Sequence, residues 1–471
     1  MISVGGKRSK DCSMSVTDET LAQARQILTD LVAIPSVSAR RQSLDACAAQ
    51  VANLLETAGL RTEVHPGAVG PFVIGETGAG EFTLIIYNHY DVQPEEPVAE
   101  WLSPPFALTE REGRLFGRGA ADDKGEFVSR LAGWNAFRAE QPGLLPFRLI
   151  WIVDGEEEVG NPSLADFLKK RFPYLRADLC WWEFGEIDSS GRPVVLMGFK
   201  GILAVELACT TARADLHSSY GAIADNPLWR LSAAIASLRN ADGRVLIEGF
   251  YDEIAPPDDL TKQLVDKPPF TLDSMMDATG VKNVLKGVKE GNFYERLNLA
   301  PCLNVNGFHG GYDGEGAKSV LPAQGSAKLD FRLVPDQDPR RIADLLRAHL
   351  DRLGFEDIEL TILDAEVEAV RSPSDHWAVT LGCELLERHF GVSPVLQPSS
   401  PASGLAQPFV RDFGATLFGA GLTHHGAMLH SPNENIIIDQ FERMIRFASD
   451  FFDALSAQAV QRANAPPSGS R

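Results

Sequence analysis

The stretch Phe82-Thr-Leu-Ile-Ile-Tyr-Asn-His-Tyr-Asp91 decides the fold class of this chain. Its first six residues form a short apolar run, which is typical of a strand buried on both faces. A second such run covers residues 147–153, and a helical pattern covers residues 124–139 between the two. Helices that alternate with buried strands predict an α/β layer fold with a largely parallel sheet. Ligands of such folds gather outside the carboxyl ends of strands, and His89 follows one such end.

The pattern of the chain changes near Lys200. Residues 202–209 and 327–333 alternate between apolar and polar side chains, as half-solvated strands do, and amphipathic helices are expected at 227–238 and 340–353. This combination predicts a smaller α+β domain with an open sheet and helices on one face.

Elements of the first type return towards the C-terminus, with helices expected at 376–390 and 439–455. A chain of 471 residues is too long for one ordinary core. We therefore expect a discontinuous catalytic domain over residues 15–199 and 371–461, with the smaller domain inserted at 200–370.

The composition excludes several classes of protein. An apolar fraction of 44% is that of a globular protein and argues against disordered and fibrous chains. Lys plus Arg number 44 against 64 for Asp plus Glu, which gives a formal net charge of -20. Such a chain repels phosphate backbones and anionic lipids, so neither nucleic acid nor a membrane surface is expected as a partner. A local basic pocket for an anionic substrate remains compatible with this charge.

The cysteines and the termini favour a cytoplasmic protein. The cysteines are scattered without a CxxC pair, which fits reduced thiols better than a disulfide framework or a zinc ribbon: Cys12, Cys47, Cys180, Cys209, Cys302 and Cys383. Residues 1–14 show no apolar segment of a signal peptide, and no run approaches the roughly 18 to 20 apolar residues of a membrane span. Residues 465–470 are expected to form a frayed end.

His89 and Asp91 project to the same side of an extended chain. Asp91 could orient the imidazole through its second ring nitrogen, or bind a metal itself, and a solvated pair is the alternative. Asp122 and Asp123 precede the helix expected from Lys124. One of them could cap that helix, while the other bridges two metal ions about 3.5 to 4 Å apart.

Glu156, Glu157 and Glu158 follow the apolar residues of the second strand. Three adjacent carboxylates in such a place repel one another and are costly to desolvate, and bound cations remove that cost. One glutamate can then ligate a metal while its neighbour acts as a general base. A solvated turn is the alternative.

Two further residues complete a candidate set of metal ligands. His430 lies in a turn rich in Ser, Pro and Asn, and Glu183 follows the apolar residues 179–182. His424 and His425 are expected at the surface. Histidine and carboxylate ligands without cysteine suit Zn²⁺ or Mn²⁺ better than Mg²⁺ or copper. Motifs for serine esterases, HExxH metalloproteases, P-loops and dinucleotide binding are absent from the sequence.

Taken in order along residues 31–451, these motifs resemble the zinc-dependent carboxypeptidase and deacylase family. That family includes glutamate carboxypeptidase, carnosine-type dipeptidases, acetylornithine deacetylase and succinyl-diaminopimelate desuccinylase. The resemblance implies two Zn²⁺ per subunit, with Mn²⁺ or Co²⁺ as substitutes. It implies Glu157 as the general base, Asp91 as the residue that orients His89, and the following metal ligands: His89, Asp122, Glu158, Glu183 and His430.

The resemblance also implies residues that handle the substrate. His217, in Asp215-Leu-His-Ser218, matches a histidine that stabilises the tetrahedral oxyanion, commonly across a dimer. Arg332, with Ser403 and Gly404, resembles a site for the substrate carboxylate. Three more residues are expected near it: Asn306, Lys318 and His376.

Two departures from the family pattern concern substrate handling. The usual Arg-Gly before the inserted domain is Lys200-Gly201 in this chain. The usual Gly-Pro-Met of the C-terminal substrate loop is Gly404-Leu405-Ala406. The departures therefore bear on substrate specificity rather than on the chemistry.

The expected function is amide-bond hydrolysis in dipeptides or at the C-terminal end of short peptides. An N-acyl or N-carbamoyl amino acid amidohydrolase is the alternative, because it would use the same centre. A non-catalytic metal-dependent binding protein is a remote second alternative. The inserted domain is expected to form a homodimer through its edge strand and to close over the substrate as a lid.

Overall fold

The computed structural model describes residues 16–463. Their contacts divide the chain into two compact units. Unit 1 contains the residues up to Leu196, Pro373–Leu396 and the residues from Pro408 on, and unit 2 contains Met197–Ser372 and Gln397–Gln407. The expectations for a signal peptide, for Cys12, for the domain start at residue 15 and for the frayed end lie outside the described residues.

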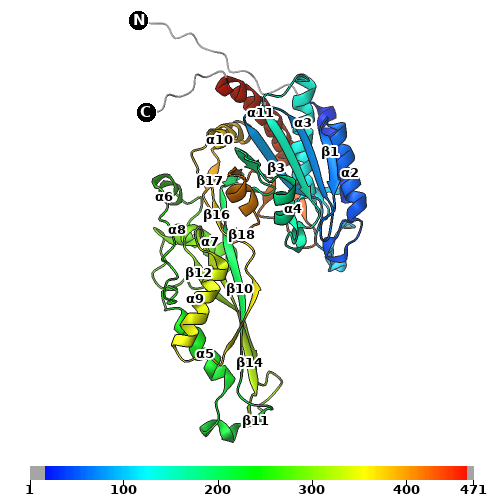
Figure 1. Ribbon diagram of the computed structural model, residues 1–471. Helices are drawn as coiled ribbons and strands as arrows, with labels where there is room; N and C mark the ends of the chain where they lie inside the picture. The colour runs from blue at the N-terminus through cyan, green and yellow to red at the C-terminus, as the bar shows by residue number, and fades with distance from the viewer. Residues whose placement is uncertain (1–15, 464–471) are drawn as a thin grey trace. The chain divides into compact units, whose positions relative to one another are not determined.

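A six-stranded sheet forms the centre of unit 1 (Figure 1). Its strands lie in the order β1 (Arg61–His65), β2 (Phe72–Gly78), β6 (Arg148–Asp154), β3 (Thr83–His89), β7 (Leu179–Trp181) and β19 (Thr416–Phe418). The strands from β6 to β19 are parallel to their neighbours, whereas β1 and β2 are antiparallel. Every residue of β3 is buried. The prediction of an α/β fold with a mixed, largely parallel sheet is confirmed.

Helices cover this sheet. They are α1 (Asp18–Val32), α2 (Leu44–Thr57), α3 (Lys124–Glu140), α4 (Leu164–Arg171), α10 (Trp377–Phe390) and α11 (Ile438–Ala463). Thr17 caps α1, since its side chain accepts a hydrogen bond from the backbone N–H of Thr20. The last helix is longer than the expected span of residues 439–455, because an apolar stripe along it stays buried as far as Ala459.

Helix α3 is buried on nearly all sides, because it packs against β3 and also contacts both α1 and α11 (Figure 1). Gly133 permits this approach, since a Cβ atom there would lie 2.4 Å from the Cβ of Ala448. The buried ammonium group of Lys124 donates to the carbonyls of Leu31 and Ile34 at 2.9 and 2.8 Å. Buried charge on α3 is therefore hydrogen-bonded rather than solvated.

Two small sheets complete unit 1 and hold its C-terminal loops. One has the order β17 (Val395–Gln397), β9 (Pro193–Leu196), β8 (Glu186–Ile187) and β20 (Thr423–His424). The other has the order β21 (Asn435–Ile437), β5 (Arg114–Phe116) and β4 (Thr109–Arg111). The expectation that His424 lies at the surface is wrong. Its ring is buried and lies 3.2 Å from Asn435 Oδ1, while His425 is exposed.

Unit 2 is built on a long antiparallel sheet with the order β12 (Cys302–Gly310), β14 (Gln324–Leu333), β10 (Gly198–Thr210) and β15 (Glu359–Asp364). Burial alternates along β10, and α5 (Pro227–Leu238) and α9 (Pro339–Arg352) pack against the sheet to enclose an apolar core. Strands β16 (Val370–Arg371) and β18 (Ser400–Ser403) pair with β10, which is why Gln397–Gln407 groups with this unit.

The rest of unit 2 lies outside this core. Strands β11 (Leu216–His217) and β13 (Val320–Leu321) form a short ladder that continues the sheet beyond the last β10–β14 pair. Helices α6 (Asp259–Val265), α7 (Leu272–Thr279) and α8 (Phe293–Leu299) surround a small apolar cluster of their own. Among residues 16–463, no helix has both the length and the apolarity to span a membrane.

Candidate metal centre and active site

The candidate metal centre lies at the carboxyl edge of the central sheet of unit 1. His89 ends β3, and Asp154, its partner in register, ends β6. Glu183 follows the end of the parallel strand β7 by two residues. Glu157 and Glu158 belong to the 3₁₀ helix η3 (Glu157–Val159) just beyond β6. The parallel strands therefore bring these groups to one edge, as expected for this kind of fold.

Asp122 lies between two imidazoles. Its Oδ1 is 3.0 Å from His89 Nε2, and its Oδ2 is 3.1 Å from His430 Nε2. His430 Nε2 is also 3.2 Å from Glu158 Oε2. One ligand atom each of Asp122, Glu158 and His430 lies within 4.8 Å of the other two. A carboxylate with one oxygen towards each of two imidazoles is the arrangement that a ligand shared by two metal ions requires.

The charges in this cluster shift the pKa values of its members. Hydrogen bonds with Asp122 and Glu158 raise the pKa of His430 to about 10. Burial raises the pKa of Glu157 to about 8, against the attraction of His89. Burial also raises the pKa of Asp122, but contacts with His430 and His89 outweigh it and hold this pKa below its ordinary value. A cation bound by these side chains would therefore have to displace protons from them.

Asp91 orients several members of the cluster. Its carbonyl oxygen lies 3.1 Å from His89 Nδ1, and its carboxylate oxygen Oδ1 lies 3.4 Å from the same atom. The two carboxylate oxygens also accept hydrogen bonds from the backbone N–H groups of Glu157 and Glu158 at 3.2 and 3.0 Å. Asp91 therefore fixes both the imidazole and the turn that carries the two glutamates.

Asp123 stands at the N-cap position of α3, but its side chain makes no capping hydrogen bond. Its Oδ2 instead accepts hydrogen bonds from Asn88 Nδ2 at 2.7 Å and from the backbone N–H of His89 at 2.9 Å. The expectation that one of the paired aspartates caps this helix is therefore wrong, because the end of β3 offers buried donors that compete for the carboxylate. The peptide bond between Asp122 and Asp123 is cis.

The residues present fit a pair of divalent ions. Glu183 is buried, and its Oε2 has no hydrogen-bond partner among the described residues. Burial and repulsion by Glu157 raise the pKa of Glu183 well above its ordinary range. A buried carboxylate oxygen without a donor is costly unless a cation satisfies it. The donor set consists of imidazole nitrogens and carboxylate oxygens, which suits Zn²⁺ or Mn²⁺.

Sequence reasoning missed Arg130, a buried residue of α3 that ties the strand ends together. Its guanidinium donates to the carbonyls of Tyr87, Trp182 and Glu183 at 3.1, 2.7 and 2.8 Å. These carbonyls belong to the ends of β3 and β7, the strands that deliver His89 and Glu183. The sequence contains one signal that could have identified Arg130, namely its pairing with Glu126 at i,i+4 spacing on a helix that must be buried.

Sequence reasoning also missed Glu434, which lies four residues after His430. It is buried, and it contacts the turn that carries Asp122. Only the long-range fold reveals this contact, because the two residues are separated by 312 positions in the chain.

The expectation for His376 as a substrate-binding residue is corrected by the structure. His376 is the N-cap of α10, and its ring accepts a hydrogen bond from the backbone N–H of Ala378. The neighbouring Trp377 ring lies 5.0 Å from the ring of Phe82, next to the amino end of β3. His89 is at the other end of that strand, about 20 Å away for the rise of a strand of this length.

In unit 2, Arg332 and Ser403 meet. The guanidinium of Arg332 donates to Ser403 Oγ at 2.9 Å and to Asp330 Oδ2 at 3.0 Å. Gly404 follows Ser403, and a Cβ at Gly404 would lie 3.2 Å from the ring of Phe199. The buried Lys200 donates to the carbonyl of Ala300 at 2.6 Å, and burial lowers its pKa to about 8.

The other candidates of unit 2 are exposed and lie farther along the sheet. His217 is in β11, and its Nδ1 accepts a hydrogen bond from the backbone N–H of Ser219 at 3.2 Å. Nε2 of the neutral ring therefore carries the hydrogen and can donate it. Lys318 Nζ lies 5.7 Å from the centre of the Tyr312 ring. Asn306 lies at a β-bulge of β12 and accepts a hydrogen bond from the side chain of Asn304.

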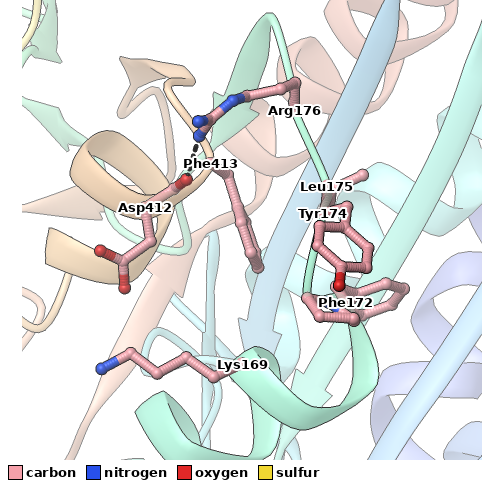
Figure 2. Close-up of a pocket in the computed structure, with 8 residues that line it drawn as sticks. Lys169, Phe172, Tyr174, Leu175, Arg176, Asp412 and Phe413 are labelled. Atoms are coloured by element: carbon pink, nitrogen blue, oxygen red, sulfur yellow. Dashed lines mark hydrogen bonds between the residues drawn. The ribbon is translucent and has the colours of Figure 1, made fainter.

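A pocket of about 320 Å³ in unit 1 lies away from this centre (Figure 2). Two segments of the chain line it: Lys169 with residues 172–176, and Asp412-Phe413. These segments lead into the amino ends of the parallel strands β7 and β19. The pocket is therefore at the sheet edge opposite the metal centre, and none of the predicted site residues lines it.

Comparison with known proteins identifies relatives over most of the chain. The model of Peptidase family M20/M25/M40 matches residues 85–454. Cys-Gly metallodipeptidase dug1 of Schizosaccharomyces pombe is 26% identical over 401 residues, which are 82% of this chain and 83% of that protein. Beta-Ala-His dipeptidase of Rattus norvegicus is 30% identical over 355 residues, which are 69% of this chain and 70% of that protein.

A solved structure agrees with these relatives. The M20 family metallo-carboxypeptidase Sso-CP2 from Sulfolobus solfataricus is 33% identical, with a TM-score of 0.84 that covers 94% of this chain and 100% of that chain. The resemblance inferred from the motifs is confirmed. The chain belongs to peptidase family M20/M25/M40 and is a metal-dependent hydrolase of the dipeptidase and carboxypeptidase type.

Proposed function

We propose that this enzyme uses two zinc ions to hydrolyse the amide bond of dipeptides or the C-terminal bond of short peptides. The observation that carries the proposal is the position of Asp122, with one carboxylate oxygen towards His89 and the other towards His430. In this assignment Glu183 completes the ligands of the His89 ion, and Glu158 completes those of the His430 ion. When bound, the ions would polarise the scissile carbonyl and increase the acidity of water.

Glu157 is the proposed general base. Its side chain is partly buried beside the cluster, and its pKa of about 8 is close to the range in which an acid–base group works well at neutral pH. It would take a proton from water and then give that proton to the leaving amine. Asp91 holds the Glu157 backbone N–H and the His89 ring, so the base and one ligand share a positioning group.

The proposed substrates carry a free carboxylate. The relatives act, by their names, on Cys-Gly and β-Ala-His dipeptides, and Arg332 with Ser403 offers a site for the C-terminal carboxylate of such molecules. The test is a panel of dipeptides beside N-acetyl, N-succinyl and N-carbamoyl amino acids. If the enzyme prefers the acylated amino acids, it is an amidohydrolase and the proposal of a peptidase is wrong. Two bound ions without any hydrolysis would support metal-dependent binding alone.

A homodimer is proposed from the separation of Arg332 and His217 within unit 2. Arg332 pairs with Ile202 near the start of β10, whereas His217 lies beyond the far end of that strand (Figure 1). Eight residues of strand between Ile202 and Thr210 span about 26 Å, and a dipeptide spans about 7 Å. Both side chains can therefore contact one substrate only if they come from different copies of the chain.

Exposed apolar groups in unit 2 support the dimer. Trp229 on α5 is 78% exposed, and the edge strand β12 carries the exposed side chains of Val305 and Phe308. Unpaired edge strands and exposed aromatic side chains favour association. Sedimentation that shows only monomer at micromolar concentration would contradict the dimer.

The cytoplasm is proposed as the compartment. The described cysteines are free thiols: Cys47, Cys180, Cys209, Cys302 and Cys383. Unpaired cysteines are common where thiols are kept reduced. Cell fractionation tests this proposal, and recovery of the protein outside the cytoplasm would contradict it.

A further inference from the structure

Glu434 is a carboxylate that the fold buries almost completely. It is 1% exposed, lies four residues after His430 and immediately precedes β21. Burial of an ionised carboxylate is costly unless charge and hydrogen bonds compensate it. The contacts of this side chain therefore indicate what it is used for.

Each oxygen of Glu434 accepts hydrogen bonds from two donors. Oε1 accepts from the backbone N–H groups of Ala121 and Asp122 at 2.8 and 3.0 Å. Oε2 accepts from the backbone N–H of Gly119 at 3.0 Å and from the buried guanidinium of Arg118 at 2.8 Å. Donors therefore occupy both oxygens, and hydrogen bonds to both oxygens favour the ionised form of a buried carboxylate.

These contacts fix a turn that has no regular structure of its own. Residues 118–123 form turns between β5 and α3, and Gly119 adopts a positive φ of 83°. Three backbone N–H groups of this turn, those of Gly119, Ala121 and Asp122, donate to this one carboxylate. The N–H of Asp122 is among them, so Glu434 sets the position of the residue whose side chain lies between His89 and His430.

The loop that carries Glu434 is itself anchored on both sides. The side chain of Asn433 accepts a hydrogen bond from the backbone N–H of Leu102 and donates to the carbonyl of Glu100. The side chain of Asn435 donates to the carbonyl of Gly426 at 2.8 Å. A rigid support of this kind keeps a ligand in place before the metal binds.

We propose that Glu434 is a positioning residue for the metal centre, and that it holds Asp122 where both imidazoles can share it. This inference rests on the ligand assignment proposed above. The carboxylate acts through the backbone of the turn, because its hydrogen bonds go to backbone N–H groups and to Arg118 rather than to the side chain of a proposed metal ligand. Its negative charge and its two oxygens are both required, since four donors converge on them.

The test is the metal affinity of the Glu434→Gln variant. The amide nitrogen of glutamine would face two donors, so one side of the carboxylate site loses its hydrogen bonds. Loss of a group that orients metal ligands typically lowers metal affinity about 10- to 100-fold. Competition with a chromogenic chelator, at a temperature where circular dichroism shows the metal-free protein folded, measures the affinity for each zinc ion.

Two further variants separate positioning from folding. Glu434→Asp keeps the charge and should weaken zinc binding less than Glu434→Gln. Asp450→Asn removes a carboxylate 2.9 Å from His389, in a largely buried pair between α10 and α11. This control should lower the midpoint of thermal unfolding without changing the affinity for zinc.

Parent-like zinc affinity in folded Glu434→Gln would overturn the inference. If that variant does not fold, parent-like affinity in folded Glu434→Asp would overturn it equally. The Asp122→Asn variant distinguishes this failure from that of the proposed ligand set. If Asp122→Asn loses zinc while both Glu434 variants keep it, only the role of Glu434 is wrong. If Asp122→Asn also keeps parent affinity, the ligand assignment itself is wrong.

Discussion

The carboxyl edge of the central sheet in unit 1 and the exposed surface of unit 2 carry candidate residues in very different states. At the first place the imidazoles and carboxylates contact one another at about 3 Å and are held by buried neighbours such as Asp91 and Arg130. At the second, His217, Asn306 and Lys318 are exposed and separated along the strands.

This difference indicates that a single chain already assembles the candidate metal centre, but not the candidate substrate-binding residues. A dense cluster of carboxylates and imidazoles must fold together with the residues that support it, because a buried polar group without a partner is costly. The groups of a substrate-binding surface need no protein partner before the substrate binds, since exposed polar groups form hydrogen bonds with water. We therefore expect changes in unit 1 to affect turnover and metal binding, and changes in unit 2 to affect substrate binding or to depend on the partner subunit.

The largest effect is expected from Glu157→Gln. General acid–base catalysis contributes about 10²- to 10⁴-fold, so kcat should fall by this factor while both metal ions stay bound. Metal analysis of the same preparation checks occupancy. Turnover at the wild-type level would show that Glu157 is not the base, and loss of a metal ion would instead place Glu157 among the ligands.

His217→Ala should lower kcat about 10²- to 10³-fold, as removal of one oxyanion donor does. Its position far from Arg332 predicts complementation between subunits. Mixed in equal amounts with Glu157→Gln and allowed to exchange subunits, it should recover about one quarter of wild-type activity, since half of the dimers are mixed and each has one intact site. Failure of the mixture to recover activity would show that His217 serves its own chain.

Arg332→Met should raise KM for dipeptides about 10- to 100-fold with a smaller change in kcat, because a charge-assisted hydrogen bond to the substrate is lost. For C-terminally amidated dipeptides, the same substitution should raise KM far less. Arg340→Met is the matched control, since Arg340 is an exposed arginine of α9 in the same unit. An equal loss for amidated and free dipeptides would remove Arg332 from carboxylate recognition.

The smallest effect concerns pH. In the metal-free protein the pKa values of His430, Glu157 and Asp154 are raised to about 10, 8 and 7. Each raised pKa means that the folded state holds its proton more tightly, so stability falls as pH rises from about 5 to 9. The midpoint of thermal unfolding should therefore be some degrees lower at pH 8.5 than at pH 5.5.

Added zinc should reverse this trend, because metal binding requires deprotonated ligands and becomes tighter at higher pH. Calorimetry in buffers with different ionisation enthalpies should show that zinc binding releases protons near pH 7. A metal-free protein whose stability rises over the same pH range would contradict the charge distribution described for unit 1.

Local patterns in the sequence predicted the parts of this structure that depend on local physics. The apolar runs around Leu84 and Ile150 gave the two central strands, because strands buried on both faces need continuous apolar sequence. The acidic and histidine motifs were found for a similar reason, since clustered carboxylates at strand ends are costly without cations.

Features that depend on distant segments were missed. Glu434 and Arg130 resemble ordinary surface charges until the fold places backbone N–H groups or carbonyls around them. The role of Asp123 changed because Asn88 and the end of β3 offer better donors than the first turn of α3. His376 was expected near the substrate, and only the packing of Trp377 on Phe82 shows that it lies at the opposite sheet edge.

The link between Glu434 and the turn of residues 118–122 has a consequence for synthesis on the ribosome. About 270 residues separate Glu158 from His430, which corresponds to roughly 15 to 55 s at ordinary translation rates. During this interval the nascent Arg118 guanidinium and the inward N–H groups have no counter-charge, and one imidazole of the centre is missing. The complete set of candidate ligands, together with the Glu434 contacts to this turn, can therefore form only after the segment with His430 and Glu434 has been synthesised.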